Sequence, residues 1–483
     1  MEDGGNCKRQ KRSRQTEENF KHENTICGLP DSILVHILSL LSMEDAVKTC
    51  LLSRRWDHLW TKVQNLYFNG PLSCKREEQE KFISFVDHTL SLLECHSIEE
   101  FSLDFNRSCS EAMNGDEKKL ILFDSYVDRW IRCAIRKKVE ALYLNFSNNP
   151  KEGPFFGVPY QLPSHIFSND SFTELMLCFC SLNPVSPIQW INLKSLFLYN
   201  IQLSDKLIQK IISGAPLLEM LRISECTGME NLNITSPNLK SLALCLKSGR
   251  FLELSVPFVE TLEISGEIEH YLLMDVSSLV DVQLIPEVKI INGLFQKVLI
   301  KIFETVCHAK ILALSTRCLQ VLSILEVTEL PSLSSNCNLL ELKTSLTKWE
   351  LPGIRLLLRT FPTLQTLIIQ KGENCGGFYL RKDLLQKYGF HEEEYWSSTL
   401  SFSCLSRTLK TVKILDFTGG SSETALVEFL LKKSLVLQKM IIYSKKAECV
   451  NEPSSFTSDD LFKFSQKLLS FPRGSPDAVV LFS

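Results

Sequence analysis

Residues 26–69, with the sequence ICGLPDSILVHILSLLSMEDAVKTCLLSRRWDHLWTKVQNLYFN, predict three short helices. Asp31 follows Leu29-Pro30 and can cap the free amides of a first helix. Ser42 and Asp45 are spaced like a capping box, which marks the start of a second helix. A third helix is predicted by apolar residues at positions i, i+3, i+4 and i+7, namely Trp56, Leu59, Trp60 and Val63.

The three predicted helices carry more apolar surface than they can cover among themselves. A module of about 40 residues buries too little of its surface to be stable on its own. Part of the apolar face must therefore pack on the rest of the chain or enter a groove of a partner. Helical spacing alone leaves both possibilities open, one being a helical cap on a larger domain and the other a docking module.

The sequence of residues 26–70 resembles the F-box, in the version found in large plant families. The resemblance rests on Leu29-Pro30, on Ile33-Leu34-x-x-Ile37-Leu38-x-x-Leu41, on Ala46-Val47, and on Leu52-Ser53-Arg54-Arg55-Trp56-x-x-Leu59-Trp60. It implies docking on a Skp-type adaptor, which joins the chain to a cullin. The residues that it assigns to the adaptor interface are Leu29, Pro30, Ile33, Leu34, Ile37, Leu38, Leu41, Ala46, Val47, Trp56, Leu59 and Trp60.

Length and composition indicate a multidomain or repeat protein without a membrane span. The 483 residues exceed one ordinary core, and 44% of them are hydrophobic and 23% charged. A net charge of −3 gives no overall attraction to nucleic acid, and no uncharged apolar run reaches the ~20 residues of a membrane span. The 17 cysteines include no C-x-x-C pair, and no signal segment precedes them, so we expect free thiols in a reducing compartment.

Residues 1–25 form a polar tail that we expect to be disordered. It contains a compact basic run, Lys8, Arg9, Lys11, Arg12 and Arg14. Clustered Lys and Arg suit the acidic grooves of import receptors, so one interpretation is a nuclear import signal. The other is a solvated tail without a targeting signal. The expected location of the protein is therefore nuclear, cytoplasmic or both.

Residues 71–138 are interpreted as linker helices and a first repeat-like segment. Helices are expected at about 77–93 and 122–137, with an alternating strand at 98–105 between them.

A repeated x-L-x-L-x unit fills residues 139–370. It occurs at 141–144, 174–177, 195–198, 220–223, 241–244 and 261–264. From Leu175 the steps to Leu196, Leu221, Leu242 and Leu262 are 21, 25, 21 and 20 residues. This spacing is typical of leucine-rich repeats, in which alternating leucines point inward and stacked units share one core. After 284 the spacing becomes loose, with further strands expected at 310–314, 341–342 and 366–369.

Residues that alternate with the leucines should line one face of the predicted sheet. Among them Phe197, Tyr199, Arg222 and Glu263 are the candidates for binding a target protein. The alternative is that these side chains are only the outer surface of a structural sheet.

The last segments are a loop insertion at 371–400 and a terminal domain at 401–483. A strand is expected from Cys404 to Ile414, a Gly419-Gly420 turn, a helix from Ala425 to Lys432 and a final strand at 437–443. This strand–helix–strand order and the amino-acid sequence of the segment resemble the FBD domain, which follows the F-box and leucine-rich segments of plant proteins.

Catalytic and metal-binding motifs are missing from the sequence. There is no phosphate-binding glycine loop, no dinucleotide fingerprint and no H-E-x-x-H. Residues 391–394 (HEEE) lack a second histidine, and Cys178-Phe179-Cys180 is a lone C-x-C with both sulfurs expected on one strand face. We therefore expect neither an enzyme nor a cofactor or metal site.

The expected fold class is α/β, with a three-helix F-box, a leucine-rich-repeat solenoid and a strand–helix–strand FBD unit. The resemblance implies a substrate-recruiting subunit of an SCF-type (Skp-cullin-F-box) ubiquitin ligase, with the repeats holding an unknown target protein. The alternative is a repeat scaffold without a ligase, in which the F-box-like helices only cap the solenoid. Neither nucleic acid nor a membrane is expected as a partner.

Overall fold

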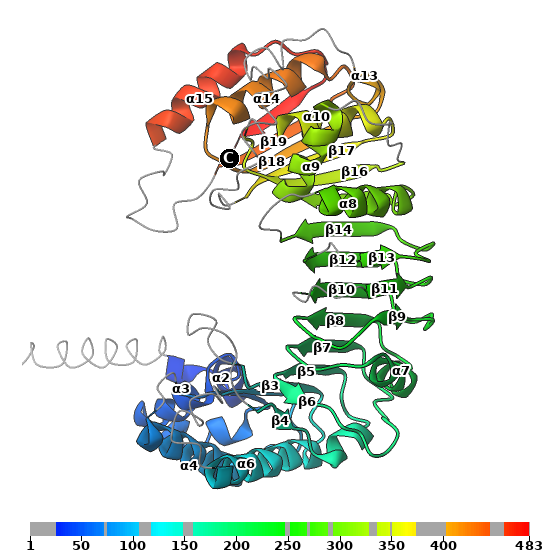
Figure 1. The fold of residues 1–483 in the computed structure, drawn as a ribbon. Helices are drawn as coiled ribbons and strands as arrows, with labels where there is room; N and C mark the ends of the chain where they lie inside the picture. Colours follow the sequence, from blue (N-terminus) through cyan, green and yellow to red (C-terminus); the bar gives the residue numbers. More distant parts are fainter. Residues whose placement is uncertain are drawn as a thin grey trace, which may run out of the picture. The chain divides into compact units, whose positions relative to one another are not determined.

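A computed structural model describes residues 26–71, 75–105, 117–147, 158–246, 252–267, 271–287, 293–327, 336–347, 350–372, 402–444 and 458–482. The chain divides into two compact units. The N-terminal unit comprises residues 1–201 with 214–216, and the C-terminal unit comprises 202–213 with 217–483. Both are mixed α/β units in which parallel strands carry helices between them, as expected from the sequence (Figure 1).

The first segment of the N-terminal unit folds into two helices followed by tight turns. Helix α2 spans Asp31–Leu38 and α3 spans Met43–Lys48, and the Ser42 hydroxyl accepts a hydrogen bond from the Asp45 amide as predicted. The capping role predicted for Asp31 is wrong, because Asp31 lies inside the first turn and Pro30 holds the N-cap position. The third α-helix is also wrong, since residues 49–63 form only 3-10 turns, at Thr49–Leu51, Arg54–Trp56 and Trp60–Lys62.

Five parallel strands make the main sheet of the N-terminal unit, in the order β1-β2-β3-β5-β7. Their bounds are Asn65–Asn69 (β1), Glu100–Asp104 (β2), Ala141–Asn145 (β3), Glu174–Cys178 (β5) and Ser195–Tyr199 (β7). A small pair, β4 (Tyr160–Gln161) and β6 (Cys180–Ser181), lies beside a 3-10 turn at Ser164–Ser168. Strand β1 was not predicted, because it lies within the segment that resembles the F-box.

Two long helices cover one side of the N-terminal strands. Helix α4 spans Arg76–Leu92 and α6 spans Glu117–Arg136, close to the predicted bounds. Phe82 of α4 stacks on Phe105 at a ring distance of 5.7 Å, and Phe105 stacks on Phe123 of α6 at 4.2 Å. The Trp130 indole donates a hydrogen bond to Asp87 at 2.6 Å, which joins α6 to α4. Every second residue of the strands faces this aromatic core.

Ten parallel strands make the main sheet of the C-terminal unit, in the order β8-β10-β12-β14-β15-β16-β17-β18-β19-β20. Their bounds are Met220–Ser224, Ser241–Leu246, Thr261–Gly266, Asp281–Pro286, Ile311–Ser315, Leu339–Thr344, Thr366–Lys371, Thr411–Phe417, Lys439–Ser444 and Val479–Phe482. The strands expected at the x-L-x-L-x units are thus confirmed, and they stack in register.

The short and the long repeats of this unit differ in the segment that connects one strand of the main sheet to the next. After helix α7 (Asp205–Gly214), the short repeats return through a second parallel sheet of β9 (Asn231–Asn233), β11 (Leu252–Ser255) and β13 (Tyr271–Leu273), which the sequence analysis missed. A step of about 20 residues leaves no room for a helix of ordinary length, since two strands and two turns use most of it.

The later repeats carry helices, namely α8 (Gly293–Thr305), α9 (Thr316–Val327), α10 (Leu351–Thr360), α13 (Ser403–Arg407), α14 (Ser421–Lys433) and α15 (Ser458–Ser470). The strand predicted to begin at Cys404 is wrong, because α13 occupies that position and β18 begins at Thr411. The strand predicted as the last one is followed by α15 and β20, which adds a further helix and strand to the FBD region. The predicted loop insertion lies largely outside the described residues.

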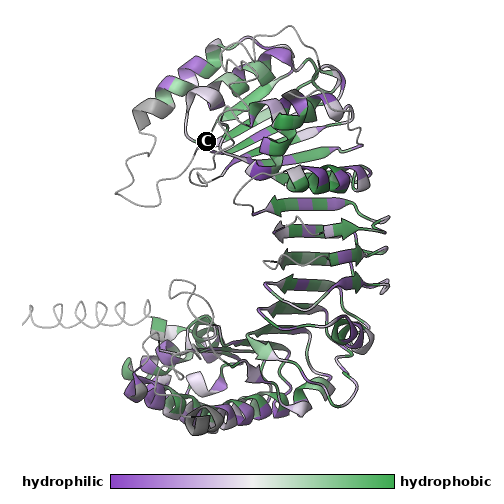
Figure 2. Ribbon diagram, viewed as in Figure 1, coloured by the Kyte–Doolittle hydropathy of each residue, from purple (hydrophilic) through white to green (hydrophobic). Residues whose placement is uncertain are grey.

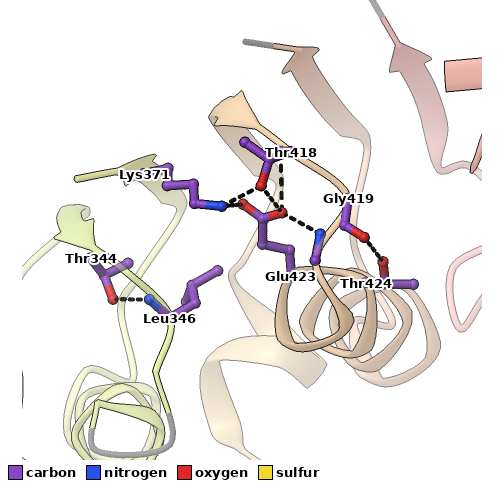
Figure 3. Close-up of polar contacts among 8 residues, drawn as sticks. Thr344, Leu346, Lys371, Thr418, Gly419, Glu423 and Thr424 are labelled. Atoms are coloured by element: carbon purple, nitrogen blue, oxygen red, sulfur yellow. Dashed lines mark hydrogen bonds and ion pairs between the residues drawn. The ribbon is translucent and has the colours of Figure 1, made fainter. Parts of the chain in front are cut away.

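An ion pair between a buried carboxylate and a half-buried lysine fixes the turn between β18 and α14 (Figure 3). The Glu423 carboxylate accepts hydrogen bonds from the Thr418 amide at 3.2 Å and the Gly420 amide at 2.8 Å. Lys371 of β17 lies 3.2 Å from the same carboxylate. Since the charge is paired and also satisfied by amides, its burial does not leave an uncompensated carboxylate.

Hydropathy follows the alternation expected of half-buried strands. Polar and apolar residues alternate along the strands (Figure 2). In β8, β10, β12 and β14 the buried positions are held by Leu221, Leu242, Leu262 and Val282, which are fully shielded from solvent. The intervening side chains form the opposite face of the sheet.

Candidate adaptor-docking patch and outward sheet face

The apolar residues between 29 and 63 divide into a buried set and an exposed set. The buried side chains are Leu34, Leu38, Met43, Ala46, Trp56, Leu59, Trp60 and Val63. They come from α2, α3 and the turns at Arg54–Trp56 and Trp60–Lys62 with the flanking Leu59 and Val63, and the turn at Trp60–Lys62 contacts both helices. Six of the twelve predicted adaptor contacts are therefore inside the module, namely Leu34, Leu38, Ala46, Trp56, Leu59 and Trp60. Helices this short have one interior, and these side chains fill it.

The other six predicted contacts remain at the surface of the module. Pro30 and Ile33 are exposed, whereas Leu29, Ile37, Leu41 and Val47 are half-buried. Three further leucines that were not assigned to the interface are more exposed than Ile33, whose exposed fraction is 45%. Leu40 is 70% exposed, Leu51 85% and Leu52 65%. We call Ile33, Leu40, Leu51 and Leu52 the apolar patch.

The sequence contains a clue to the patch that the helical pattern concealed. Leu40 does not share the i, i+4 spacing of Leu34 and Leu38, so all three cannot face one core. Leu51 and Leu52 are consecutive, and consecutive residues of a helical turn point in different directions. At least one side chain of each group had to remain outside.

Arg55 joins the two parts of the module that carry the patch. Its guanidinium donates to the Asp31 carboxylate at 3.1 Å from Nε and 2.6 Å from Nη2, and also to the Leu29 carbonyl oxygen. These contacts bring the segment that begins with Leu51 and Leu52 to the start of α2. Ile33 lies in the first turns of that helix, whereas Leu40 follows its C-terminal end.

The second candidate surface is the outward sheet face of the N-terminal unit, formed by the strand residues that alternate with the core. These residues are Asn65, Tyr67, Asn69, Glu100, Ser102, Asp104, Ala141, Tyr143, Asn145, Glu174, Met176, Cys178, Ser195, Phe197 and Tyr199. The predicted candidates Phe197 and Tyr199 are among them, and both are half-buried. The set contains three carboxylates and four aromatic rings but no Lys, Arg or His.

Hydrogen bonds hold these carboxylates beside neutral groups. The Tyr67 hydroxyl donates to Glu100 at 2.8 Å, and the Asn145 amide donates to Asp104 at 3.2 Å. Burial, reinforced by Glu100, raises the pKa of Tyr67 to about 12. Burial also raises the pKa of Tyr143, and the charge of Glu174 adds to this increase. The pKa of Asp104 is raised by burial, which the hydrogen bond from Asn145 partly offsets.

The other two predicted target-binding residues lie in the C-terminal unit and pair with each other. Arg222 of β8 reaches across β10 to Glu263 of β12, with 3.2 Å between Nη2 and Oε2. The small Ala243 lies between them in the register. Their charges are mutually neutralised, so this part of the surface is electrostatically different from the outward sheet face.

No group of three His, Cys, Asp or Glu residues in the described ranges is arranged to hold a metal ion. The expectation that Cys178 and Cys180 lie on one strand face is wrong. Strand β5 ends at Cys178, and Phe179 has a positive φ of 55° before β6 begins. Within the described part of the chain, no helix has the length and apolarity needed to cross a membrane. The predicted import residues Lys8, Arg9, Lys11, Arg12 and Arg14 lie outside the described residues.

Three family models match the chain. The F-box domain matches residues 26–67, the FBD matches 399–442, and the model described as FBD-associated F-box protein At5g56370, LRR repeats, matches 127–369. The last match alone covers half of the chain.

Similar proteins of Arabidopsis thaliana extend over most of the chain. The F-box/LRR-repeat protein At5g02910 is 28% identical over 434 residues, which are 86% of this chain and 87% of the relative. The FBD-associated F-box protein At5g56370 is 25% identical over 469 residues, covering 95% of this chain and 100% of the relative. F-box and repeat domains of this kind mediate protein interaction. With F-box, repeats and FBD in this order, the chain belongs to the family of FBD-associated F-box proteins with leucine-rich repeats.

Proposed function

We propose that this chain is a substrate-recruiting subunit of an SCF-type ubiquitin ligase, docking on a Skp-type adaptor and through it on a cullin. The observation that carries the proposal is the apolar patch. The module already has a filled core, yet Leu40, Leu51 and Leu52 remain mostly exposed. Exposed apolar clusters on a folded module are typical of interfaces, and such side chains supply much of the binding free energy when a partner covers them. A target protein would bind to the sheet, and the chain itself would act without catalytic residues.

A repeat scaffold with a helical cap is the second candidate, and one set of contacts favours it. Helix α3 contacts β1, and the amides of Glu94 and Cys95 donate to the Thr61 carbonyl oxygen at 2.9 and 3.3 Å. These contacts cover the edge strand, as a cap does. Capping elements, however, have a polar outer side. The exposed leucines have no role in a cap, and they therefore favour adaptor docking.

Substitution of the patch separates the two functions. We expect Leu51→Ala with Leu52→Ala to lower the recovery of a Skp-type adaptor and a cullin with the purified chain, with an affinity loss of about tenfold or more. The melting temperature should stay the same, because both side chains are exposed. The matched control is Leu217→Ala with Leu469→Ala, which truncates two leucines exposed elsewhere (44% and 75%) and should leave adaptor recovery intact.

The buried set gives the opposite result. Leu34→Ala should lower stability by about 2–5 kcal/mol, because it creates a cavity in the module core. Adaptor binding that survives in the Leu51 and Leu52 double variant would refute docking through the patch. A wild-type chain that recovers neither adaptor nor cullin would favour the scaffold.

We further propose that the basic run at residues 8–14 directs the chain to the nucleus. Clustered Lys and Arg suit the acidic grooves of import receptors. Access of a ligase subunit to nuclear targets would then depend on this tail.

A further inference from the structure

A serine flanked by two aromatic rings and two carboxylates lies on the outward sheet face. Ser102 of β2 pairs in the register with Tyr67 of β1 and Tyr143 of β3. On its own strand, Glu100 and Asp104 are the next residues that point to the same side. Neighbouring strands lie about 4.8 Å apart, so the short Ser102 side chain has a ring on each neighbouring strand and a carboxylate on each side along its own strand.

The charge on this face is not balanced from within. Glu100 and Asp104 accept hydrogen bonds from a phenol and an amide, which are neutral donors. Within the described ranges, no salt bridge involves either of them or Glu174. The pKa of Asp104 lies above its ordinary value because burial disfavours its charge. Aromatic rings attract cations over their faces, so rings and carboxylates here favour the same kind of ligand.

We propose that the outward sheet face binds an extended protein segment that carries arginine or lysine side chains, with one cationic head held over Ser102 between Tyr67 and Tyr143. Glu100 and Asp104 pair with that head, and Glu174 is placed for a second one. Glu100 and Glu174 lie two strands apart in the register, a distance of about 10 Å. One small cation cannot bridge them, whereas two side chains of one segment can. The inference rests on the proposed function, because it names the chemical class of the target.

Binding of a labelled peptide to the full-length chain tests this inference. The probe is a short synthetic peptide of alternating arginine and glycine, followed by fluorescence anisotropy. We expect saturable binding that weakens severalfold when the salt concentration rises. Glu100→Gln with Asp104→Asn should lower the affinity about tenfold. Tyr143→Leu should lower it about threefold, because one ring is lost.

The matched control neutralises two acids away from the sheet face. Glu140→Gln with Asp170→Asn makes the same change in net charge at exposed positions. This variant should bind the arginine peptide like wild type, and a peptide of alternating glutamate and glycine should not bind. Ser102→Leu provides a second test that keeps every charge, since the larger side chain occupies the position proposed for the cationic head and should also weaken binding. Melting temperatures of all variants show whether they fold.

Two results would overturn the inference. One is a wild-type chain without saturable binding of the arginine peptide at low salt. The other is equal binding by the sheet-face variant and the control variant. Recovery of the Skp-type adaptor is measured on the same proteins and should not change. An adaptor that fails to bind wild type would refute the ligase role while leaving the peptide result to decide the chemistry of the sheet face.

Discussion

Individual residue roles were predictable where one rule fixes them. Alternation along a strand puts the leucines of x-L-x-L-x units inward, and Phe197 and Tyr199 consequently on the outward face. Helical spacing could not decide which of Ile33 and Leu34 is buried, because that depends on how the turns after α3 pack. Tyr67 and Glu100 were missed for a different reason, since their juxtaposition comes from pairing between strands that lie 33 residues apart.

Asp281 is a residue whose charge opposes folding. Its Oδ1 atom is buried without a hydrogen-bond partner among the described residues, and burial together with the charge of Glu341 raises its pKa. The native state therefore binds protons more tightly than the unfolded chain, so stability falls as the pH rises above the ordinary carboxyl value of 3.8. We expect Asp281→Asn to stabilise the protein at pH 7 by on the order of 1 kcal/mol.

Thermal unfolding between acidic and neutral pH checks this expectation. The advantage of Asp281→Asn should shrink as the pH approaches 3.8, because wild-type Asp281 becomes protonated as well. Glu253→Gln is the control, since Glu253 is exposed and its neutralisation should not alter the melting temperature at either pH. A melting temperature at pH 7 that is equal to or below that of wild type would contradict the expected cost of the charge.

At the scale of elements, short strands were easier to predict than buried helices. Repeats of 20 or 21 residues place each strand at a regular step, which the sequence reveals directly. Helices α9 and α10 were missed because their side chains are buried on nearly all sides. Residues 318–323 of α9 are almost entirely shielded, so this helix lacks the polar side on which a periodic pattern depends. The polar side of α10 is limited to Arg355 and Arg359.

Close packing of α9 against α10 depends on Gly353. A Cβ atom at this position would lie 2.3 Å from the Leu319 carbonyl oxygen, and the Gly353 amide donates to Ser323 Oγ at 2.8 Å. Because backbone atoms cannot move aside cheaply, Gly353→Ala should destabilise the C-terminal unit by about 1–3 kcal/mol. Chemical denaturation measures the loss. Gly293→Ala at the start of α8 is the control, since no atom lies within 4 Å of its Cβ position. Equal stability of the two variants would show that the helices do not need this contact.

At the scale of the whole molecule, the order of the segments was predictable, whereas the assignment of the candidate surfaces to the two compact units was not. The F-box, the repeats and the FBD region each have a recognisable sequence motif, and the positions of these motifs give the order of the segments along the chain. The sequence could not show that the apolar patch and the outward sheet face belong to the same compact unit. Nor could it show that the charged pair Arg222 and Glu263, chosen with Phe197 and Tyr199, belongs to the other.

The proposed import signal is tested on the intact chain in cells. At 55.1 kDa the protein should enter the nucleus slowly by diffusion, so a signal has a measurable effect. We expect replacement of Lys8, Arg9, Lys11 and Arg12 by Ala to lower the nuclear-to-cytoplasmic ratio of a fluorescent fusion severalfold, because an import receptor recognises clustered positive charge.

The control for this experiment removes the same charge from exposed helix positions. Lys206, Lys210, Lys297 and Lys301 are exposed on α7 and α8, and their replacement by Ala should leave the distribution unchanged. Equal shifts in both variants would trace the effect to net charge instead of the cluster. A distribution that stays constant in the tail variant would make the basic run a solvated tail, and nuclear access would then have to come from a partner. Since adaptor binding is proposed to depend on the patch alone, the tail variant should still recover the Skp-type adaptor as wild type does.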